Sequence, residues 1–328
     1  MKILLLLLSF SFFALGTACK HGDEETDSAQ KFFGKKTEFS KAGVKILNLK
    51  AEDGLALPTL VMYPEASQAE ALPLVVMTNG FLVNRKLYQT VLAQVALEGF
   101  VVVAPQGYDV SLPLPIGKPS TDVEARRVAE AVTWLETRLA TLTAKEIDFT
   151  NVGLMAHSRG GKVAWTIVRD NLLPVKAIVA IDPVDGNVDG SKRVTGGEFK
   201  LNVPALVIGS GLGGNGLQAC APVKLNYSQF WNTVTDSPSY LQVAKDYGHM
   251  DFLEEKAGCG LICAVCASAG KKFPKEDFRN WVASSASLYL KAVLYGDKAA
   301  LARFEDRASP IEVTKSNSYP SPANVSTP

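Results

Sequence analysis

The sequence predicts an α/β fold in which a mostly parallel sheet is covered by helices on both faces. Two observations carry this prediction: short apolar runs alternate with segments of helical periodicity, and an apolar hairpin precedes them. Parallel strands form unbroken apolar runs because helices cover both faces of their sheet. The hairpin is expected to supply antiparallel strands at one edge. Ligands of such sheets bind beyond the carboxyl ends of the strands, so functional residues are expected in the loops there.

The expected strands are apolar or alternating runs bounded by turn residues. Glu52-Asp53-Gly54 separates the first two runs and predicts the turn of the hairpin. In chain order the expected strands are Val44–Lys50, Leu55–Tyr63, Leu74–Thr78, Phe100–Ala104, Val152–Ala156, Val175–Ile181, Ala205–Ile208 and Tyr240–Ala244.

Between these strands, apolar residues recur at helical spacing. The first such segment is expected to stop at Gly99, and the last one closes the fold. The second has Thr121 as its expected N-cap, with Glu124 completing a capping box. The expected helices are Arg85–Leu97, Thr121–Leu139, Gly161–Val168 and Phe278–Leu294.

The bulk composition limits the classes of function. A chain of 328 residues, 47% of them hydrophobic, is long enough for one large α/β domain or two small ones. The formal net charge of +1 offers no basic field for nucleic acid, so no nucleic-acid partner is expected. We expect one folded domain over residues 41–308. The preceding residues 19–40 are polar and predict a flexible tether, and residues 309–328 are rich in Ser, Pro, Asn and Thr and predict a disordered tail.

The N-terminus predicts export. Lys2 precedes an apolar run from Ile3 to Leu15, and small residues follow, which is typical of a signal peptide over residues 1–18. The run is too short to favour a bilayer span. Cys19 after small residues also fits lipoprotein processing, although such signals usually carry Leu where Gly16 stands. Lipidation of Cys19, with membrane association in the cell envelope, and simple secretion are equal alternatives.

Four cysteines remain beyond Cys19, namely Cys220, Cys259, Cys263 and Cys266. An exported chain favours disulfides, so we expect these thiols to be paired. The alternatives are free thiols or a metal cluster built on the last three, but no nearby histidine completes such a cluster except His249. The spacing does not determine which cysteines pair.

The stretch LMAHSRGGKVAW, Leu154–Trp165, places one serine where a strand ends and a helix begins. Ser158 has small residues two positions before and two after it, which relieve crowding in a sharp turn. This is the nucleophile elbow of α/β-hydrolases, usually Gly-x-Ser-x-Gly, with Ala156 in place of the first glycine. The alternative is that Ser158 is a plain N-cap of the helix.

A serine hydroxyl needs a base to take its proton, and the chain has three histidines. His21 lies in the predicted tether. His157 directly precedes the serine, so its side chain is expected to point into the packing below the turn. His249 follows the last strand, where the base of such hydrolases belongs, and is the predicted base.

The carboxylate that orients the base is expected between serine and histidine in the chain. The turn after Ala205–Ile208 holds no acid. Asp182 stands at the end of the preceding strand, whereas Asp185 and Asp189 follow in a looser turn. We therefore favour Asp182, with a role in holding the tautomer of the base and stabilising its imidazolium.

The negative charge of a tetrahedral intermediate needs backbone donors. One expected donor is the Arg159 amide at the start of the helix. The other is the Phe81 amide in the loop Thr78-Asn79-Gly80-Phe81, where Gly80 allows a tight bend.

With these groups placed, the chain resembles the chlorophyllase family. The resemblance covers about Leu55 to Leu294 and implies an α/β-hydrolase fold with a Ser158-Asp182-His249 triad. It departs from the family at Ala156, and at Asn79, where His is often found. The motifs that carry it are His157-Ser158-Arg159-Gly160-Gly161-Lys162, Ile181-Asp182-Pro183-Val184-Asp185-Gly186 and Tyr247-Gly248-His249-Met250-Asp251-Phe252-Leu253, supported by Gly80-Phe81, Gly99–Gln106, Gly211-Leu212-Gly213 and Cys220-Ala221-Pro222.

The resemblance implies hydrolysis of the phytyl ester of chlorophyll to chlorophyllide and phytol through an acyl-enzyme, with no metal or cofactor. Apolar residues near the site fit a bulky ester, and Leu82, Phe230 and Trp231 are the candidate substrate-binding residues, with Leu112–Ile116 adding to an apolar rim. Ordinary core packing is the alternative for each of them.

Two other functions stay open: an esterase or lipase-like enzyme acting on other apolar esters, and a pigment or lipid binder with little turnover. The exported N-terminus differs from that of a simple plastid-targeted plant enzyme and leaves the host open. Routing to a photosynthetic compartment is the alternative location.

Overall fold

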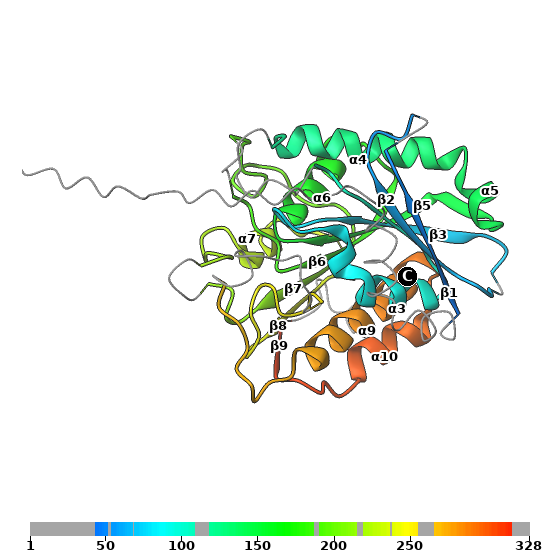
Figure 1. The fold of residues 1–328 in the computed structure, drawn as a ribbon. Helices are drawn as coiled ribbons and strands as arrows, with labels where there is room; N and C mark the ends of the chain where they lie inside the picture. Colours follow the sequence, from blue (N-terminus) through cyan, green and yellow to red (C-terminus); the bar gives the residue numbers. More distant parts are fainter. Residues whose placement is uncertain are drawn as a thin grey trace, which may run out of the picture. The chain divides into compact units, whose positions relative to one another are not determined.

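A nine-stranded sheet forms the centre of the described part of the chain in the computed structural model (Figure 1). Its order is β1-β2-β4-β3-β5-β6-β7-β8-β9. The strands are β1 (Val44–Leu49), β2 (Thr59–Pro64), β3 (Leu72–Thr78), β4 (Val101–Pro105), β5 (Ile147–His157), β6 (Val175–Ile181), β7 (Ala205–Ser210), β8 (Tyr240–Ala244) and β9 (Val313–Ser316).

The structure describes residues 43–51, 54–67, 69–108, 118–186, 190–214, 219–236, 238–254 and 266–316. These belong to the unit Ala42–Pro328. The predicted signal peptide and tether lie outside the described residues. So do Cys19, Cys259, Cys263, Asp189 and the predicted rim Leu112–Ile116.

The predicted α/β-hydrolase fold is confirmed. Six neighbouring strands pair in parallel, in the order β4, β3, β5, β6, β7 and β8. The hairpin β1–β2 pairs antiparallel and joins β4 antiparallel, as expected for one edge. The strands β2, β3, β4 and β7 are buried along their whole length, which explains their unbroken apolar sequences.

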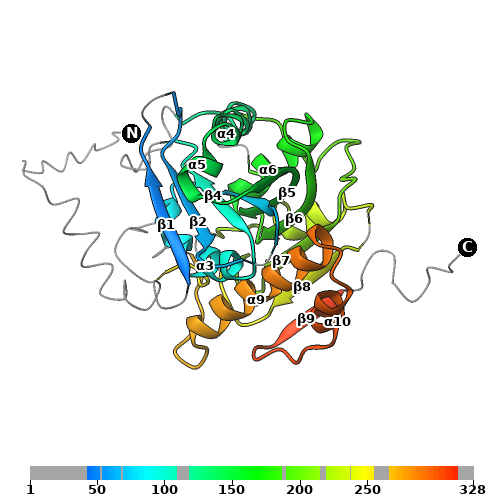
Figure 2. The ribbon, with the colours of Figure 1, turned by 90° about the vertical axis from the view of Figure 1, so that its right-hand side faces the viewer.

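Helices cover both faces of the sheet. In Figures 1 and 2, α4 and α6 lie on one face, and α3, α9 and α10 lie on the other. Among the described residues, no helix is long and apolar enough to cross a membrane. The helices are the 3-10 helix η2 (Arg85–Tyr88), α3 (Gln89–Leu97), α4 (Thr121–Glu136), α5 (Leu139–Thr143), α6 (Arg159–Arg169), α7 (Tyr227–Trp231), α9 (Lys275–Leu294) and α10 (Lys298–Asp306).

The predicted cap of α4 is wrong by one residue. Ser120, rather than Thr121, has extended backbone angles, and its hydroxyl accepts the amide of Val123. Glu124 then falls one residue beyond the position that a capping box requires. Its carboxylate instead pairs with Arg159 on α6. Glu124 therefore forms an ion pair between two helices and does not cap its own helix.

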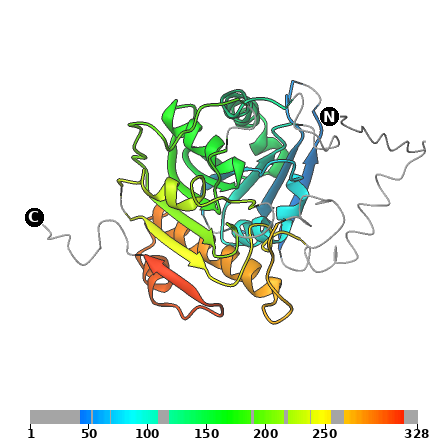
Figure 3. The same cartoon turned by 90° about the vertical axis from the view of Figure 1, so that its left-hand side faces the viewer.

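The prediction of a disordered tail from residue 309 is wrong for its first part. Val313–Ser316 forms β9, which pairs antiparallel with β8 (Figure 3). Ile311 is buried beside it, and Lys245 forms an ion pair with Glu312. A short polar edge strand lacks an apolar run of its own and gains its order from the backbone bonds that β8 offers, so the sequence pattern did not show it. Residues 317–328 lie outside the described residues.

A disulfide joins Cys220, in the segment after β7, to Cys266, in the segment before α9. Pairing of these two cysteines confirms that part of the expectation from the sequence. The bridge links the loop after β7 to residues 266–269, which contact the loop that carries His249, as described below. It therefore ties together two segments at the carboxyl edge of the sheet.

Removing this bridge should destabilise the fold, because it constrains the unfolded chain over a sequence separation of 46 residues. Loop-closure entropy gives about 4 kcal/mol for a loop of this length. Urea unfolding of the oxidised protein and of Cys220→Ser/Cys266→Ser, both without reductant, measures the loss. An unchanged urea midpoint in the double variant contradicts the prediction.

Candidate active site

Ser158 occupies a strained turn between β5 and α6. Its φ of 54° lies in the left-handed region, which non-glycine residues rarely adopt. The two glycines after it are required by close packing. A Cβ on Gly160 would overlap the carbonyl of Thr78, and one on Gly161 would overlap Pro183. These contacts hold α6 close to β3 and give the sharp strand-turn-helix that the sequence predicted.

The structure brings Ser158, His249 and Asp182 together from the ends of β5, β8 and β6. The His249 Nε2 lies 2.8 Å from the Ser158 Oγ, and its Nδ1 lies 2.6 Å from the Asp182 Oδ2. A carboxylate only accepts, so Nδ1–H donates to Asp182 and the bare Nε2 accepts the serine O–H. This is the tautomer that a base for the serine requires.

Asp182 is held on both of its oxygens. The amide of Ser210 donates to Oδ1 at 3.0 Å, while Oδ2 accepts from His249. The residue has a φ of 40° and is buried, as is His249. Ser158 is 9% exposed, more than either of its two partners.

Asp185, the alternative carboxylate, is used elsewhere. It accepts the amides of Val194 and Thr195 at 3.1 and 2.8 Å, and its Oδ1 lies 3.7 Å from the Lys162 Nζ. The side chains of Asp185 and Lys162 are both fully buried. This acid therefore anchors the segment around Val194 and is not hydrogen-bonded to His249.

His157 is a buried histidine with both ring nitrogens satisfied, as the sequence predicted. Its Nδ1 lies 2.9 Å from the Tyr88 hydroxyl, and its Nε2 lies 3.1 Å from the carbonyl of His249. Its pKa lies well below the ordinary value of 6.5, first because burial desolvates the charged ring and second because His249 repels that charge. The ring is therefore neutral.

The loop Asn79–Asn84, called here the oxyanion loop, is fixed around the Phe81 amide. The Asn79 Nδ2 donates to the Pro105 carbonyl at 3.2 Å, and the Leu82 amide donates to the Tyr108 hydroxyl at 2.7 Å. Within the described part of the chain, no acceptor is found for the Phe81 amide. The amides on both sides of Phe81 are therefore taken, while the Phe81 amide is left for another acceptor.

The Arg159 side chain points away from the site. It forms an ion pair with the buried Glu124, donates to the Pro119 carbonyl at 2.7 Å and lies over the ring of Tyr108. Its backbone opens α6, and the first amides of a helix have no acceptor within the helix. Any contribution of Arg159 to an oxyanion therefore comes from its backbone.

Asp251 holds the loop that carries His249, a role that the sequence analysis did not assign. It accepts the amides of Gly248 and Ala269, both at 2.7 Å, and pairs with Lys275 at 3.1 Å. A Cβ on Gly248 would overlap the carbonyl of Ala267. The only sequence signal was an acid two residues after the histidine.

The three candidate substrate-binding residues separate into different environments. Phe230 is fully buried, and its ring packs edge-on against Trp165 with 5.0 Å between the ring centroids. Phe230 is therefore part of the core, which was the alternative to substrate binding. Trp231 is half-buried beside this core. Leu82 lies in the oxyanion loop with a φ of 56° and is 8% exposed.

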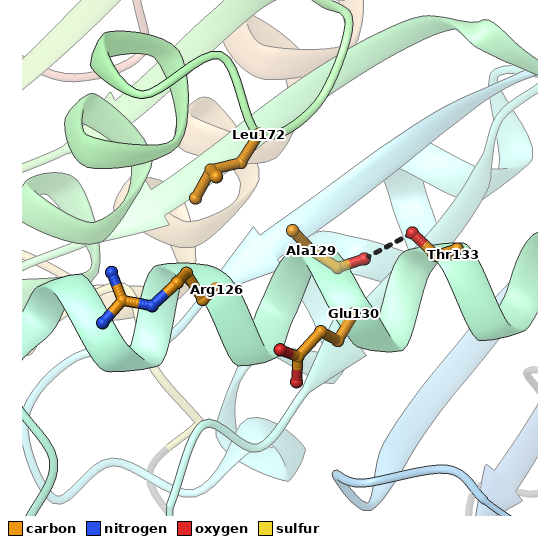
Figure 4. A pocket seen from close by; sticks show the side chains of 5 residues that line it. All are labelled: Arg126, Ala129, Glu130, Thr133 and Leu172. Carbon is orange, nitrogen blue, oxygen red and sulfur yellow. Dashed lines mark hydrogen bonds between the residues drawn. The ribbon is translucent and has the colours of Figure 1, made fainter.

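A hollow of about 350 Å³ lies elsewhere, between α4 and the segment that carries Leu172 (Figure 4). Its lining comes from α4 and from Leu172, and it includes none of the three residues of the hydrogen-bonded chain. The figure shows Arg126, Ala129, Glu130 and Thr133 on α4 and Leu172 on a neighbouring segment, with one local bond from the Thr133 hydroxyl to the Ala129 carbonyl. The candidate site is therefore located by its hydrogen bonds rather than by this hollow.

The low pKa of His157 predicts acid sensitivity. Below about pH 6.5, His157 binds a proton in the unfolded chain but stays neutral in the native protein. The free energy of unfolding is therefore unaffected by this group above about pH 6.5 and falls as the pH decreases below it. The slope contributed by this group approaches about 1.4 kcal/mol per pH unit below 6.5. Urea unfolding of the wild type and His157→Gln between pH 5 and 7.5 measures it, and equal slopes in both proteins contradict the prediction.

Known proteins of one family are similar to this chain over most of its length. The model of the family described as Chlorophyllase matches residues 28–319. Chlorophyllase-2 of Arabidopsis thaliana is 29% identical over 266 residues, which is 74% of this chain and 80% of that protein. Chlorophyllase-1 of the same plant is 30% identical over 269 residues, 76% and 80% of the two chains.

A third relative, chloroplastic Chlorophyllase-1 of Citrus sinensis, is 31% identical over 235 residues, covering 67% of this chain and 68% of its own length. The family match spans nearly the whole described unit, including β5, β6 and β8, whose ends carry Ser158, Asp182 and His249. The chain therefore belongs to the chlorophyllase family of carboxylic ester hydrolases.

Proposed function

We propose that this protein is a serine esterase that hydrolyses the phytyl ester of chlorophyll to chlorophyllide and phytol through an acyl-enzyme. The observation that carries the proposal is the unbroken chain of hydrogen bonds from Ser158 through His249 to Asp182. Membership of the chlorophyllase family supports chlorophyll as the substrate.

In the first half of the proposed reaction, His249 Nε2 takes the proton of Ser158 as the serine oxygen attacks the ester carbonyl. Asp182 stabilises the imidazolium that forms and keeps its own negative charge. The tetrahedral oxyanion accepts the amides of Phe81 and Arg159. The bond from carbon to the phytyl oxygen then breaks, and His249 gives its proton to that oxygen, which releases phytol.

In the second half, the acyl group of the pigment is bound to Ser158. His249 takes a proton from water, and the water oxygen attacks the acyl carbon. The ester bond to Ser158 breaks, and the serine recovers its proton from the imidazolium. Chlorophyllide leaves, and the steps use only protein groups and water.

The apolar half of the substrate is proposed to contact Leu82 and Trp231. Leu82 lies beside the proposed oxyanion donor, so a bound ester carbonyl would place its substituents near this side chain. Trp231 ends α7, the short helix whose Phe230 is already taken by the core.

The proposed location rests on the N-terminal sequence. Residues 1–18 act in this proposal as a signal peptide that exports the domain, with membrane anchoring if Cys19 is lipidated. The Citrus relatives are chloroplastic by name, which supports a photosynthetic compartment as the alternative destination. Mass spectrometry of the mature N-terminus distinguishes these routes by the cleavage site and by the mass of any lipid.

Replacing the nucleophile should abolish chlorophyllide release. Ser158→Ala removes the attacking oxygen, and loss of a triad member lowers kcat by about 10⁴-fold or more. Purified protein is incubated with chlorophyll a, and separately with short p-nitrophenyl esters, and product is measured for the wild type and the variant. Turnover of short esters alone would assign a general esterase instead, and pigment binding without turnover in either protein would assign a binder.

Replacing the orienting carboxylate tests the choice of acid. Asp182→Asn should lower kcat by about 10⁴-fold, because a neutral amide no longer stabilises the required tautomer and imidazolium. Asp170→Asn is the matched control, since Asp170 is exposed and pairs with Arg169 at the far end of α6. Its kcat should equal that of the wild type. Near-normal turnover in Asp182→Asn refutes the assignment.

A further inference from the structure

We propose that Tyr88 and His157 are positioning residues that hold the oxyanion loop and the base His249 in register with each other. The proposal rests on the esterase function above and adds two residues to it that touch neither the ester nor the nucleophile. The motivating observation is a second hydrogen-bonded chain beneath the site, separate from the one that joins Ser158, His249 and Asp182.

The second chain begins at the oxyanion loop and ends at the backbone of the base. The Gly80 amide lies 2.9 Å from the Tyr88 hydroxyl, which lies 2.9 Å from the His157 Nδ1. The His157 Nε2 in turn lies 3.1 Å from the His249 carbonyl. Gly80 directly precedes the proposed donor Phe81, so the chain links one oxyanion donor to the residue that supplies the base.

One arrangement of protons satisfies all three bonds. The His249 carbonyl only accepts, so His157 Nε2–H donates to it, and the Nδ1 of the neutral ring carries a lone pair. The Tyr88 O–H then donates to Nδ1, and its oxygen accepts the Gly80 N–H. The low pKa of His157 and the raised pKa of Tyr88, both caused chiefly by burial, keep this arrangement in place.

Packing makes the chain stiff. A Cβ on Gly80 would lie 2.8 Å from the His157 Nδ1 and 3.2 Å from its Cε1, so the loop backbone lies directly against the imidazole. The ring of His157 is 4.8 Å from that of His249 and 4.8 Å from that of Phe252. Tyr88 and His157 are both buried, where unpaired polar groups are costly and each bond is directional.

The positions of Tyr88 and His157 affect turnover because the reacting groups tolerate only small displacements. His157 is adjacent in the chain to Ser158, packs on the oxyanion loop and donates to the backbone of His249. A displacement of about 1 Å in such groups lowers turnover by about 100-fold. A loss of the second chain should therefore lower kcat more than it raises KM, since the substrate itself touches neither residue.

Tyr88→Phe tests the role with the least change of shape. It removes one O–H and leaves the Gly80 amide and the His157 Nδ1 without their partner. Tyr289→Phe is the matched control: Tyr289 is equally buried and loses one bond, to the Pro238 carbonyl at 2.8 Å, on α9 away from the site. Both variants should be less stable than the wild type. A loss of stability alone therefore does not distinguish a positioning role from a purely structural one.

We measure kcat and KM with a p-nitrophenyl ester as the substrate. The concentration of active sites is determined by titration with a phosphonate ester that labels the nucleophile, and kcat is given per active site. Counting only labelled sites removes the effect of unfolded protein. We expect Tyr88→Phe to lower kcat at least ~10-fold with KM within ~3-fold of the wild type. Tyr289→Phe should keep the wild-type kcat.

A double-variant cycle tests whether the two residues act as one unit. His157→Gln keeps a side-chain N–H that can donate to the His249 carbonyl, but it has no acceptor atom at the position of the imidazole Nδ1, which is the atom that Tyr88 contacts. The losses in kcat for Tyr88→Phe and His157→Gln should be less than multiplicative when combined, because either change breaks the same link. Tyr289→Phe combined with His157→Gln should be multiplicative.

Two outcomes overturn the inference, provided that the wild type is active. In the first, Tyr88→Phe and Tyr289→Phe have the same kcat per titrated site. In the second, the double-variant cycle shows no coupling between Tyr88 and His157. The proposed function fails separately if the wild type hydrolyses no ester and the phosphonate does not label Ser158, and the inference then fails with it.

Discussion

The backbone of Ser158 is held at a positive φ that side-chain-bearing residues rarely adopt, and the packing that holds it decides the geometry of the whole site. Such a conformation carries about 1–3 kcal/mol of strain for a non-glycine residue. The absence of side chains at Gly160 and Gly161 lets α6 approach Thr78 and Pro183 closely enough to support it. The turn then presents the hydroxyl at the carboxyl edge of the sheet, where the loops after β3, β6 and β8 also begin.

Buried carboxylates hold those loops. A buried acid is stable only when hydrogen-bond donors or opposite charge replace the water that it has lost. Asp182 meets this need with the ring of His249 and a backbone amide, Glu124 with the guanidinium of Arg159, and Asp251 with amides before and after its own loop. Each of these acids therefore joins segments that lie apart in the chain.

Much of the fold was predictable, because apolar runs and helical periodicity are local signals. β6 and β8 have the expected bounds, and β5 and α9 are longer than expected but in the expected places. The errors arose where a tertiary partner mattered more than local pattern. The role of Glu124 depended on Arg159, and β9 depended on β8. Likewise, the aromatic ring of Phe230 was taken up by the core instead of a binding surface.

The sequence by itself determined the serine turn, the choice of His249 by position and elimination, and a short set of acids for the third place, because each follows from what stands at a strand end. Only the tertiary structure decided which acid meets the imidazole and what lies beneath it. Asp182 and Asp185 are three residues apart, yet one contacts His249 and the other Thr195. Tyr88 carried no signal in the sequence, since its hydroxyl gains a partner only when η2 packs beneath the end of β5.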